Sequence, residues 1–106
     1  MIRKQLAIVT ILLLTLCAEG GSAGAWVTVK RVNDGDTVQL ADGRFVRYIG
    51  VNAPEINHAH NTAEPFGFEA RARNNELVGT QRIRLEFDIE RFDDYGRTLA
   101  YVFLPD

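Results

Sequence analysis

Three separated segments of this 106-residue chain place acidic and basic side chains beside a turn at the end of a predicted strand. They are residues 34–37, 47–55 and 93–97. A carboxylate can bind a hard cation or activate water, and arginine offers a planar fork of donors that matches two phosphate oxygens. Together the segments predict a site that cleaves phosphate esters.

The first two segments supply carboxylates. Asp34 and Asp36 flank Gly35, and we expect one acid to face the site while the other holds the turn, because neighbouring extended positions point to opposite faces. Taken alone, the tripeptide could simply form a turn. Pro54 fixes the backbone before Glu55 and directs that carboxylate away from the strand end.

Arginines occupy the second and third segments. Arg47 lies in an otherwise apolar strand, so it must face solvent or a partner, and Arg97 starts the last strand after the turn at Gly96. A surface role for either arginine stays open at this point. His58 and His60 are metal-ligand types, but a His-Ala-His pair in a polar loop is more often solvated, and we assign it no role.

Residues 1–25 have the features of a secretory signal peptide. A basic pair precedes an apolar run over residues 6–16, and small residues up to Ala25 offer a cleavage site. The run is shorter than the roughly 20 residues of a transmembrane helix, so we expect a secreted or periplasmic protein without stable membrane insertion. Lipidation at Cys17 is the less favoured alternative, because Leu16 stands where a small residue is expected.

Charge and cysteine content limit the function classes. Cleavage after Ala25 turns the 12 basic and 14 acidic side chains into 10 and 13, a net charge of −3, and removes the only cysteine. General adhesion to nucleic acid is therefore not supported. A phosphate site with its own bound cation remains compatible, because the acids collect the metal and the metal meets the phosphate.

The remaining residues, 26–106, predict one small domain of five strands and one helix. The expected strands are 26–32, 37–40, 45–51, 81–90 and 97–104. Short turns, including Asp-Gly at 42–43, predict that the first three strands form an antiparallel meander. Residues 56–64 form a polar loop in this interpretation.

A helix of about four turns is expected between the third and fourth strands. Pro65 suits its first turn, and Gly79 suits its end. Its apolar face would contain Phe66, Ala70, Leu77 and Val78, and the inward face of the fourth strand would contain Ile83, Leu85, Phe87 and Ile89. The order favours a mainly β (α+β) fold, a five-stranded Greek-key barrel of the oligonucleotide/oligosaccharide-binding (OB) type.

Three motifs carry a family resemblance: Asp-Gly-Asp-Thr-Val at 34–38, Val-Arg-Tyr-Ile-Gly-Val-Asn-Ala-Pro-Glu at 46–55, and Asp-Tyr-Gly-Arg-Thr-Leu-Ala-Tyr at 94–101. They resemble the staphylococcal nuclease (thermonuclease) family, in the same order, and residues 65–77 resemble that family's first helix. The resemblance implies a calcium-dependent phosphodiesterase that acts on DNA and RNA. We also expect a monomer.

The resemblance also implies roles for single residues. Asp36 would be a metal carboxylate, and the backbone carbonyl of Ala53 a further ligand. Asn52 stands where the family has a second metal aspartate; an amide oxygen can still bind Ca²⁺, but we expect weaker affinity because one negative charge is missing. Asp93 would lie near a turn that bounds the metal region.

The remaining roles concern catalysis. Glu55 would be the general base that acts on water, and Arg47 and Arg97 would bind the phosphate and stabilise the transition state. Retention of this set favours an enzyme over the alternative, a catalytically weak or inactive nucleic-acid-binding barrel. The family's C-terminal helices are absent from the sequence, so we also weigh a minimal barrel that needs a partner and a truncated fragment without function.

Overall fold

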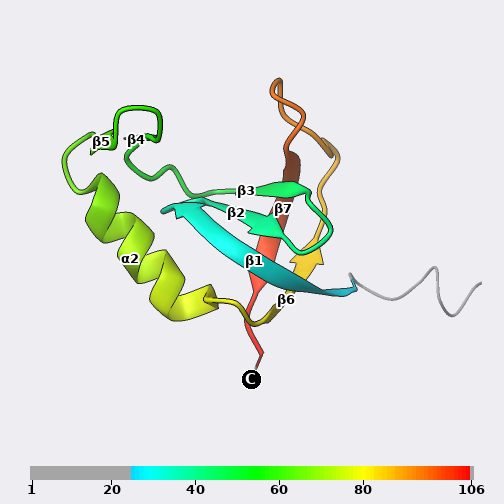
Figure 1. Cartoon of the computed structure of the whole chain (residues 1–106). Coiled ribbons are helices and arrows are strands. Elements are labelled where there is room, and N and C mark those ends of the chain that lie inside the picture. The colour runs from blue at the N-terminus through cyan, green and yellow to red at the C-terminus, as the bar shows by residue number, and fades with distance from the viewer. Residues whose placement is uncertain (1–24, 106) are drawn as a thin grey trace, which may run out of the picture.

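Five strands close into a barrel in the computed structural model, which describes residues 25–105 (Figure 1). Residues 1–24 of the predicted signal peptide (residues 1–25), including Cys17, lie outside the described residues. Among residues 25–105, no helix is long and apolar enough to cross a membrane. The expected OB-type barrel with one helix inserted between its strands is confirmed.

The barrel strands are β1 (Trp26–Asp34), β2 (Thr37–Leu40), β3 (Phe45–Tyr48), β6 (Arg82–Glu86) and β7 (Thr98–Phe103). Their order around the barrel is β1-β2-β3-β7-β6, closed by pairing of β1 with β6. All neighbours are antiparallel except β3 and β7, which run parallel. The predicted meander of the first three strands is therefore confirmed.

Alternation along the strands sends one set of side chains into the barrel. The buried core consists of Val29, Val38, Leu40, Val46, Val78, Ile83, Leu85 and Ala100. The β2–β3 turn has the expected glycine chemistry, because Gly43 has φ +96° and its N–H donates to the carbonyl of Leu40. This tight turn sets the register that places Arg47 opposite Thr37.

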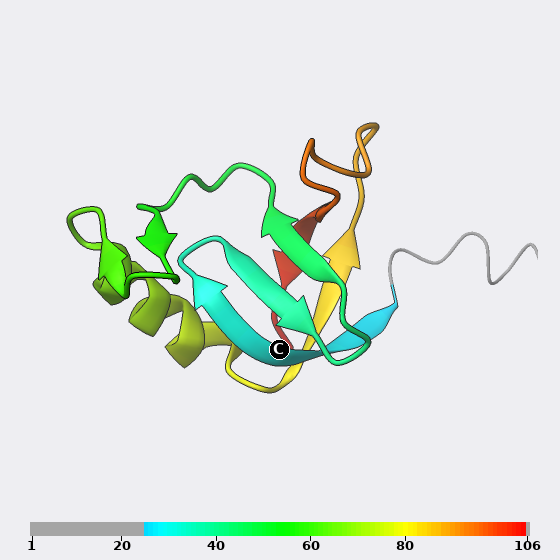
Figure 2. The same ribbon diagram turned by 45° about the horizontal axis from the view of Figure 1, so that its top comes forward.

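The inserted helix is α2 (Gly67–Val78), which packs on β1 (Figure 2). Its buried positions are Gly67, Asn74 and Val78, spaced at helical intervals. The prediction that Phe66 and Leu77 share the core face is wrong, because these side chains are 75% and 42% exposed. Phe66 has φ +66° and precedes the helix, so the first turn begins later than Pro65 suggested.

The predicted polar loop contains a short hairpin, β4 (Ile56–Asn57) with β5 (Thr62–Ala63). Gly67 lies against it, because a Cβ there would come within 2.7 Å of the Ala63 Cβ and 3.2 Å of the Glu55 carbonyl oxygen. Only glycine lets the helix start this close to the hairpin. The contact ties the backbone of Glu55 to α2.

Two predicted strands are too long. The fourth ends at Glu86, the last residue paired with β7, so Phe87 and Ile89 are 38% and 96% exposed and are not inward-facing as predicted. Apolar and polar residues continue to alternate beyond Glu86, but this segment does not pair with β7 there. The third strand stops at Tyr48 rather than Val51, before the positive φ of Gly50.

Candidate active site

Asp36 is the most enclosed of the predicted site residues, at 1% exposure in the turn between β1 and β2. Its Oδ1 accepts a hydrogen bond of 2.9 Å from the Thr37 hydroxyl. Its Oδ2 accepts the Ala53 N–H at 2.9 Å and lies 3.2 Å from Arg47 Nη2. Burial of a carboxylate is costly unless hydrogen-bond donors and an opposite charge lie beside it, and Asp36 has both.

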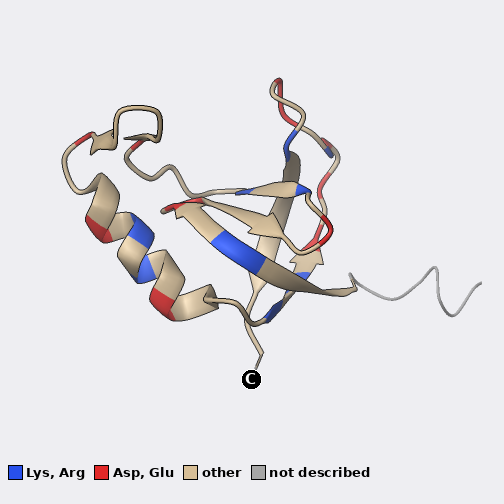
Figure 3. Ribbon diagram, in the orientation of Figure 1, with Lys and Arg blue, Asp and Glu red and all other residues tan. Residues whose placement is uncertain are grey.

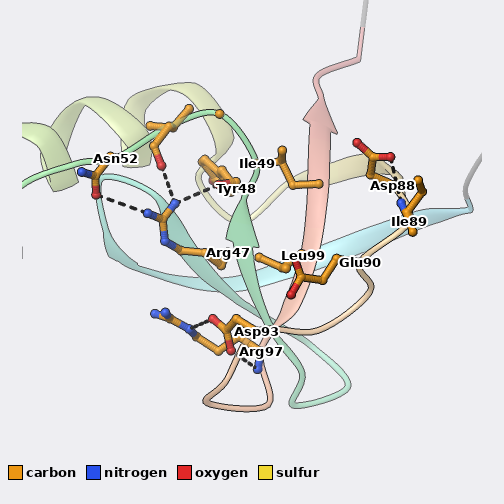
Figure 4. A pocket seen from close by; sticks show the side chains of 12 residues that line it. Arg47, Tyr48, Ile49, Asn52, Asp88, Ile89, Glu90, Asp93, Arg97 and Leu99 are labelled. Carbon is orange, nitrogen blue, oxygen red and sulfur yellow. Dashed lines mark hydrogen bonds and ion pairs between the residues drawn. The ribbon is translucent and has the colours of Figure 1, made fainter.

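Arg47 does not project into solvent; it folds along the segment that follows β3 (Figure 4). Its Nη1 donates to the carbonyl oxygens of Tyr48, at 2.8 Å, and Val51. Its Nη2 lies 3.4 Å from Asn52 Oδ1 in addition to its ion pair with Asp36. The guanidinium therefore holds the segment after β3 against the β1–β2 turn, and its side chain is 18% exposed.

Arg97 is positioned by Asp93, four residues earlier. Its Nε lies 2.6 Å from Asp93 Oδ2, and Asp93 Oδ1 accepts the backbone N–H groups of Tyr95 and Arg97 at 2.9 Å each. Burial alone would raise the pKa of Asp93, but the hydrogen bonds from Arg97 and Tyr95 lower it below its usual value. The carboxylate thus stays charged and orients the guanidinium at the start of β7.

Two neighbouring pockets contain the catalytic candidates. A pocket of about 650 Å³ is lined by both arginines and by Asn52, and a smaller one of about 350 Å³ is lined by Glu55. Arg97 lines both pockets, so it lies at the boundary between the pocket of Arg47 and the pocket of Glu55. Glu55 is exposed, and its backbone N–H is held by Glu64 Oε1 at 2.7 Å.

The other turn aspartate, Asp34, holds the loop, as predicted. It is 7% exposed, and its Oδ1 accepts the Asp36 N–H at 3.2 Å. Burial, with the nearby charges of Asp36 and Glu55, raises the pKa of Asp34 to about 6. The two acids therefore perform different tasks, although both are buried.

Sequence reasoning missed a buried network centred on Asn74 of α2. Asn74 is 5% exposed; its Oδ1 accepts the Tyr48 hydroxyl at 2.8 Å, and its Nδ2 donates to the Asp34 carbonyl at 2.9 Å. Burial also raises the pKa of Tyr48 to about 12, so its hydroxyl remains a donor. The spacing of Asn74 in the sequence could have indicated its burial. It lies four residues after Ala70 and four before Val78, on the same face of the helix.

Close packing around Gly35 brings the site segments together. A Cβ at Gly35 would lie 2.6 Å from the Ala53 Cβ and 2.8 Å from the Ala70 Cβ. Glycine is therefore required where the β1–β2 turn, the segment after β3 and helix α2 meet. This contact explains how Ala53 reaches Asp36.

The oxygen donors fit a hard divalent cation. Asp36 Oδ2 and Asn52 Oδ1, two of the implied ligand oxygens, both contact the same atom, Arg47 Nη2, at 3.2 and 3.4 Å. Ala53 directs its N–H, not its carbonyl, to Asp36. Within residues 25–105, no three His, Cys, Asp or Glu side chains group as a metal site, so the donor set has few negative charges.

Comparison with known proteins places the chain among nucleases of one family. A family model described as "Staphylococcal nuclease homologue" matches residues 45–106. The thermonuclease of Staphylococcus intermedius is 47% identical over 81 residues, covering 74% of this chain and 48% of that protein. Endonuclease YncB of Bacillus subtilis is 43% identical over 82 residues, covering 74% of this chain and 39% of that protein.

A third relative, the SPbeta prophage-derived endonuclease YokF of Bacillus subtilis, is 42% identical over 82 residues, covering 74% of this chain and 28% of that protein. The chain thus spans less than half the length of these curated relatives. The family match extends from β3 through the last described strand and includes Arg47, Glu55 and Arg97. The chain therefore belongs to the staphylococcal nuclease homologue family.

Proposed function

We propose that this chain is a calcium-dependent nuclease that hydrolyses phosphodiester bonds of DNA and RNA. One observation carries the proposal: two guanidinium groups line the same pocket. They belong to Arg47 in β3 and to Arg97 directly before β7. Each is held by a carboxylate, Asp36 or Asp93, before any substrate arrives. Relatives named thermonuclease and endonuclease support the same activity.

The arginines would bind the non-bridging oxygens of the scissile phosphate. Attack on a phosphodiester increases the negative charge on these oxygens, and donors already in place stabilise that charge without reorganising. Arg47 is fixed by the carbonyls of Tyr48 and Val51, and Arg97 is fixed by Asp93. The pocket therefore offers two oriented positive charges. Arg97 is held through Nε, which leaves its two Nη groups for phosphate oxygens, whereas Arg47 would exchange one of its present Nη partners for the phosphate.

Three residues would hold the cation: Asp36, Asn52 through its amide oxygen, and Ala53 through its carbonyl. A bound Ca²⁺ supplies positive charge to the phosphate oxygen and to water at the site. Asn52 contributes no negative charge, so we propose weaker cation binding than a second carboxylate would give. Arg47 forms an ion pair of 3.2 Å with Asp36, which places an opposite charge beside this buried carboxylate.

Glu55 would act as the general base. Its carboxylate is exposed and lines the pocket that Arg97 shares, so it can accept a proton from water next to a phosphate held by that arginine. The rigid residue Pro54 and the hydrogen bond from the Glu55 N–H to Glu64 fix its backbone.

A digestion assay tests the proposal. Purified protein is incubated with single-stranded DNA and with RNA, in Ca²⁺ or in chelator. We expect cleavage only with Ca²⁺, and a loss of roughly 100-fold or more in Glu55→Gln, as for removal of a general base. Glu69→Gln is the matched control, because Glu69 is an exposed acid in the first turn of α2. Binding of nucleic acid without cleavage would refute the nuclease proposal and support the alternative, a nucleic-acid-binding barrel without catalytic activity.

We also propose export and a monomeric state. The basic pair, the apolar run over residues 6–16 and the small residues before Trp26 support removal of a signal peptide after Ala25. N-terminal sequencing of protein from a bacterial culture tests this, and a mature terminus at Trp26 is expected. Light scattering should give the mass of one chain; a dimer mass would contradict the monomer.

A further inference from the structure

A basic cleft lies between β1 and α2, away from the catalytic pockets. We use this name for the cavity of about 360 Å³ lined by Lys30, Arg31, Val32, Arg71, Ala72, Asn75 and Thr80. None of these residues also lines either active-site pocket. Every charged residue among them is a cation. Figure 3 shows basic segments on both elements that form the cleft.

The cations of the basic cleft have no acidic partner within the part of the chain that the structure describes. The ion pairs between residues 25 and 105 involve Arg44, Arg47, Arg73, Arg84 and Arg97. Lys30, Arg31 and Arg71 take part in none of them. Three like charges that face one cavity in a chain of net charge −2 create a local positive potential that attracts anions.

The positive surface continues past the cleft onto β6. Thr28 of β1 pairs with Arg82, and Lys30 lies two residues further on the same strand face. Arg82 also takes part in none of the ion pairs of residues 25–105. The basic residues thus form a band that runs from α2 across β1 to β6, which suits an extended anion rather than a single small one.

Exposed aromatic rings lie beside both ends of this band. Arg71 lies 5.3 Å from the ring centre of Phe68, and Arg82 lies 5.5 Å from that of Trp26. The two aromatic residues are 36% and 45% exposed. Basic residues that follow a backbone, with aromatic rings on which bases stack, are the usual combination of surfaces that bind single-stranded nucleic acid.

We propose that the basic cleft is a second binding site, which holds the phosphate backbone of single-stranded nucleic acid while bases stack on Phe68 and Trp26. The inference deepens the proposed function, because this strand would be the flanking part of the substrate. A structural link to the catalytic site exists through Ala70, which precedes Arg71 and lies against Gly35 of the β1–β2 turn.

Fluorescence anisotropy of the full chain with a labelled oligothymidylate, in chelator so that no cleavage occurs, tests the site. The decisive variant replaces Lys30, Arg31 and Arg71 by Gln. Its affinity should fall tenfold or more at low salt, and the slope of log affinity against log salt should decrease by about 2, at ~0.7 for each lost phosphate contact. Affinity within twofold of the unmodified chain would overturn the proposal, as would no binding at all.

A matched pair of single variants guards against unfolding. Arg71→Gln and Arg73→Gln change the same charge on the same helix, but Arg73 pairs with Glu76 at 2.9 Å and does not line the cleft. Only Arg71→Gln should weaken binding, by about threefold, whereas equal effects would overturn the proposal. Inorganic polyphosphate distinguishes the ligand class: affinity equal to that for the oligothymidylate would rule out the stacking role and assign the cleft to polyanions in general.

A small substrate separates this inference from the proposed nuclease. The p-nitrophenyl phosphodiester of thymidine is too short to reach beyond the active site, so the triple variant should cleave it with Ca²⁺ at the unmodified rate. If the unmodified chain binds the oligothymidylate through the cleft but cleaves no ester, the nuclease proposal fails and the binding site stands. If the unmodified chain cleaves the ester and the triple variant binds the oligothymidylate with unchanged affinity, the nuclease proposal stands and the second binding site fails.

Discussion

Replacing Asn74 by Ala should destabilise the domain and loosen the catalytic turn, because one amide joins three elements. The amide holds the Tyr48 hydroxyl of β3 at 2.8 Å and the Asp34 carbonyl of β1 at 2.9 Å from a position that is 5% exposed. Truncation leaves both groups without this partner. We expect the consequence to reach Asp36, whose N–H is held by Asp34 Oδ1.

The magnitude follows from the two hydrogen bonds. A buried polar group that loses its partner costs about 1–3 kcal/mol, and the half-buried Tyr48 hydroxyl should be near the lower limit. A total of about 3 kcal/mol is reduced by roughly 0.5 kcal/mol, because Ala is the better helix former. The net loss of about 2.5 kcal/mol corresponds to a decrease of about 10–20 °C in Tm for a domain of this size.

Urea denaturation in chelator measures this loss, with Asn75→Ala as the control. Asn75 is the exposed neighbour on the same helix, so its replacement gains the same helix propensity and should change the free energy of unfolding by no more than about 0.5 kcal/mol. In a double-mutant cycle with Tyr48→Phe, the two losses should not add, because they share one hydrogen bond. Equal effects of Asn74→Ala and Asn75→Ala, or full additivity, would refute the positioning role.

Three further predictions concern the turn and the cation. Asp34→Asn keeps the acceptor for the Asp36 N–H but removes a carboxyl group whose pKa is raised to about 6 in the folded protein. Because the folded state disfavours the ionised carboxylate, the wild-type fold loses stability as the pH rises toward 6. The variant should therefore be more stable than the wild type by about 2 kcal/mol at pH 8, and this gain should vanish below about pH 4. Urea titrations at the two pH values check this, and a pH-independent gain would contradict it. Asn52→Asp should tighten Ca²⁺ binding roughly tenfold in calorimetry, because it adds a negative ligand; unchanged affinity would remove Asn52 from the cation site. Gly35→Ala should lower the free energy of unfolding by about 2–3 kcal/mol through overlap with Ala70, and Ala70→Gly should relieve part of this loss; strict additivity of the two melting shifts would rule out the contact.

Local patterns were sufficient to predict the barrel. Alternation and the Asp-Gly turn at 42–43 defined the meander, and the inserted helix with its end at Gly79 was placed correctly. Element ends were less accurate, because pairing depends on a neighbouring strand that local alternation does not reveal. Residues 87–90 keep the alternation of β6 but have no partner there, and Phe66 adopts a left-handed conformation that apolar spacing cannot indicate.

Residue types and the family resemblance predicted which residues form the candidate site, but they did not predict its contacts. The motifs brought Asp36, Arg47, Asn52 and Ala53 together, as the structure does. The arginine was expected to face solvent or a partner, and its partner is the buried carboxylate itself. To predict the hydrogen bonds of Asn74, one must know which face of α2 packs on β1. The predicted face was partly wrong, because Phe66 and Leu77 are exposed.

In the proposed reaction, two preorganised arginines stabilise the phosphodiester transition state in the presence of Ca²⁺. Single-turnover cleavage of a labelled DNA strand, compared among the unmodified chain, Arg47→Lys and Arg97→Lys, measures this stabilisation. Lysine keeps the charge but loses the two-point fork, so each variant should lose about 100-fold or more in rate. Rates within threefold of the unmodified chain would refute the role of the arginines, and equal cleavage in chelator would refute the need for Ca²⁺.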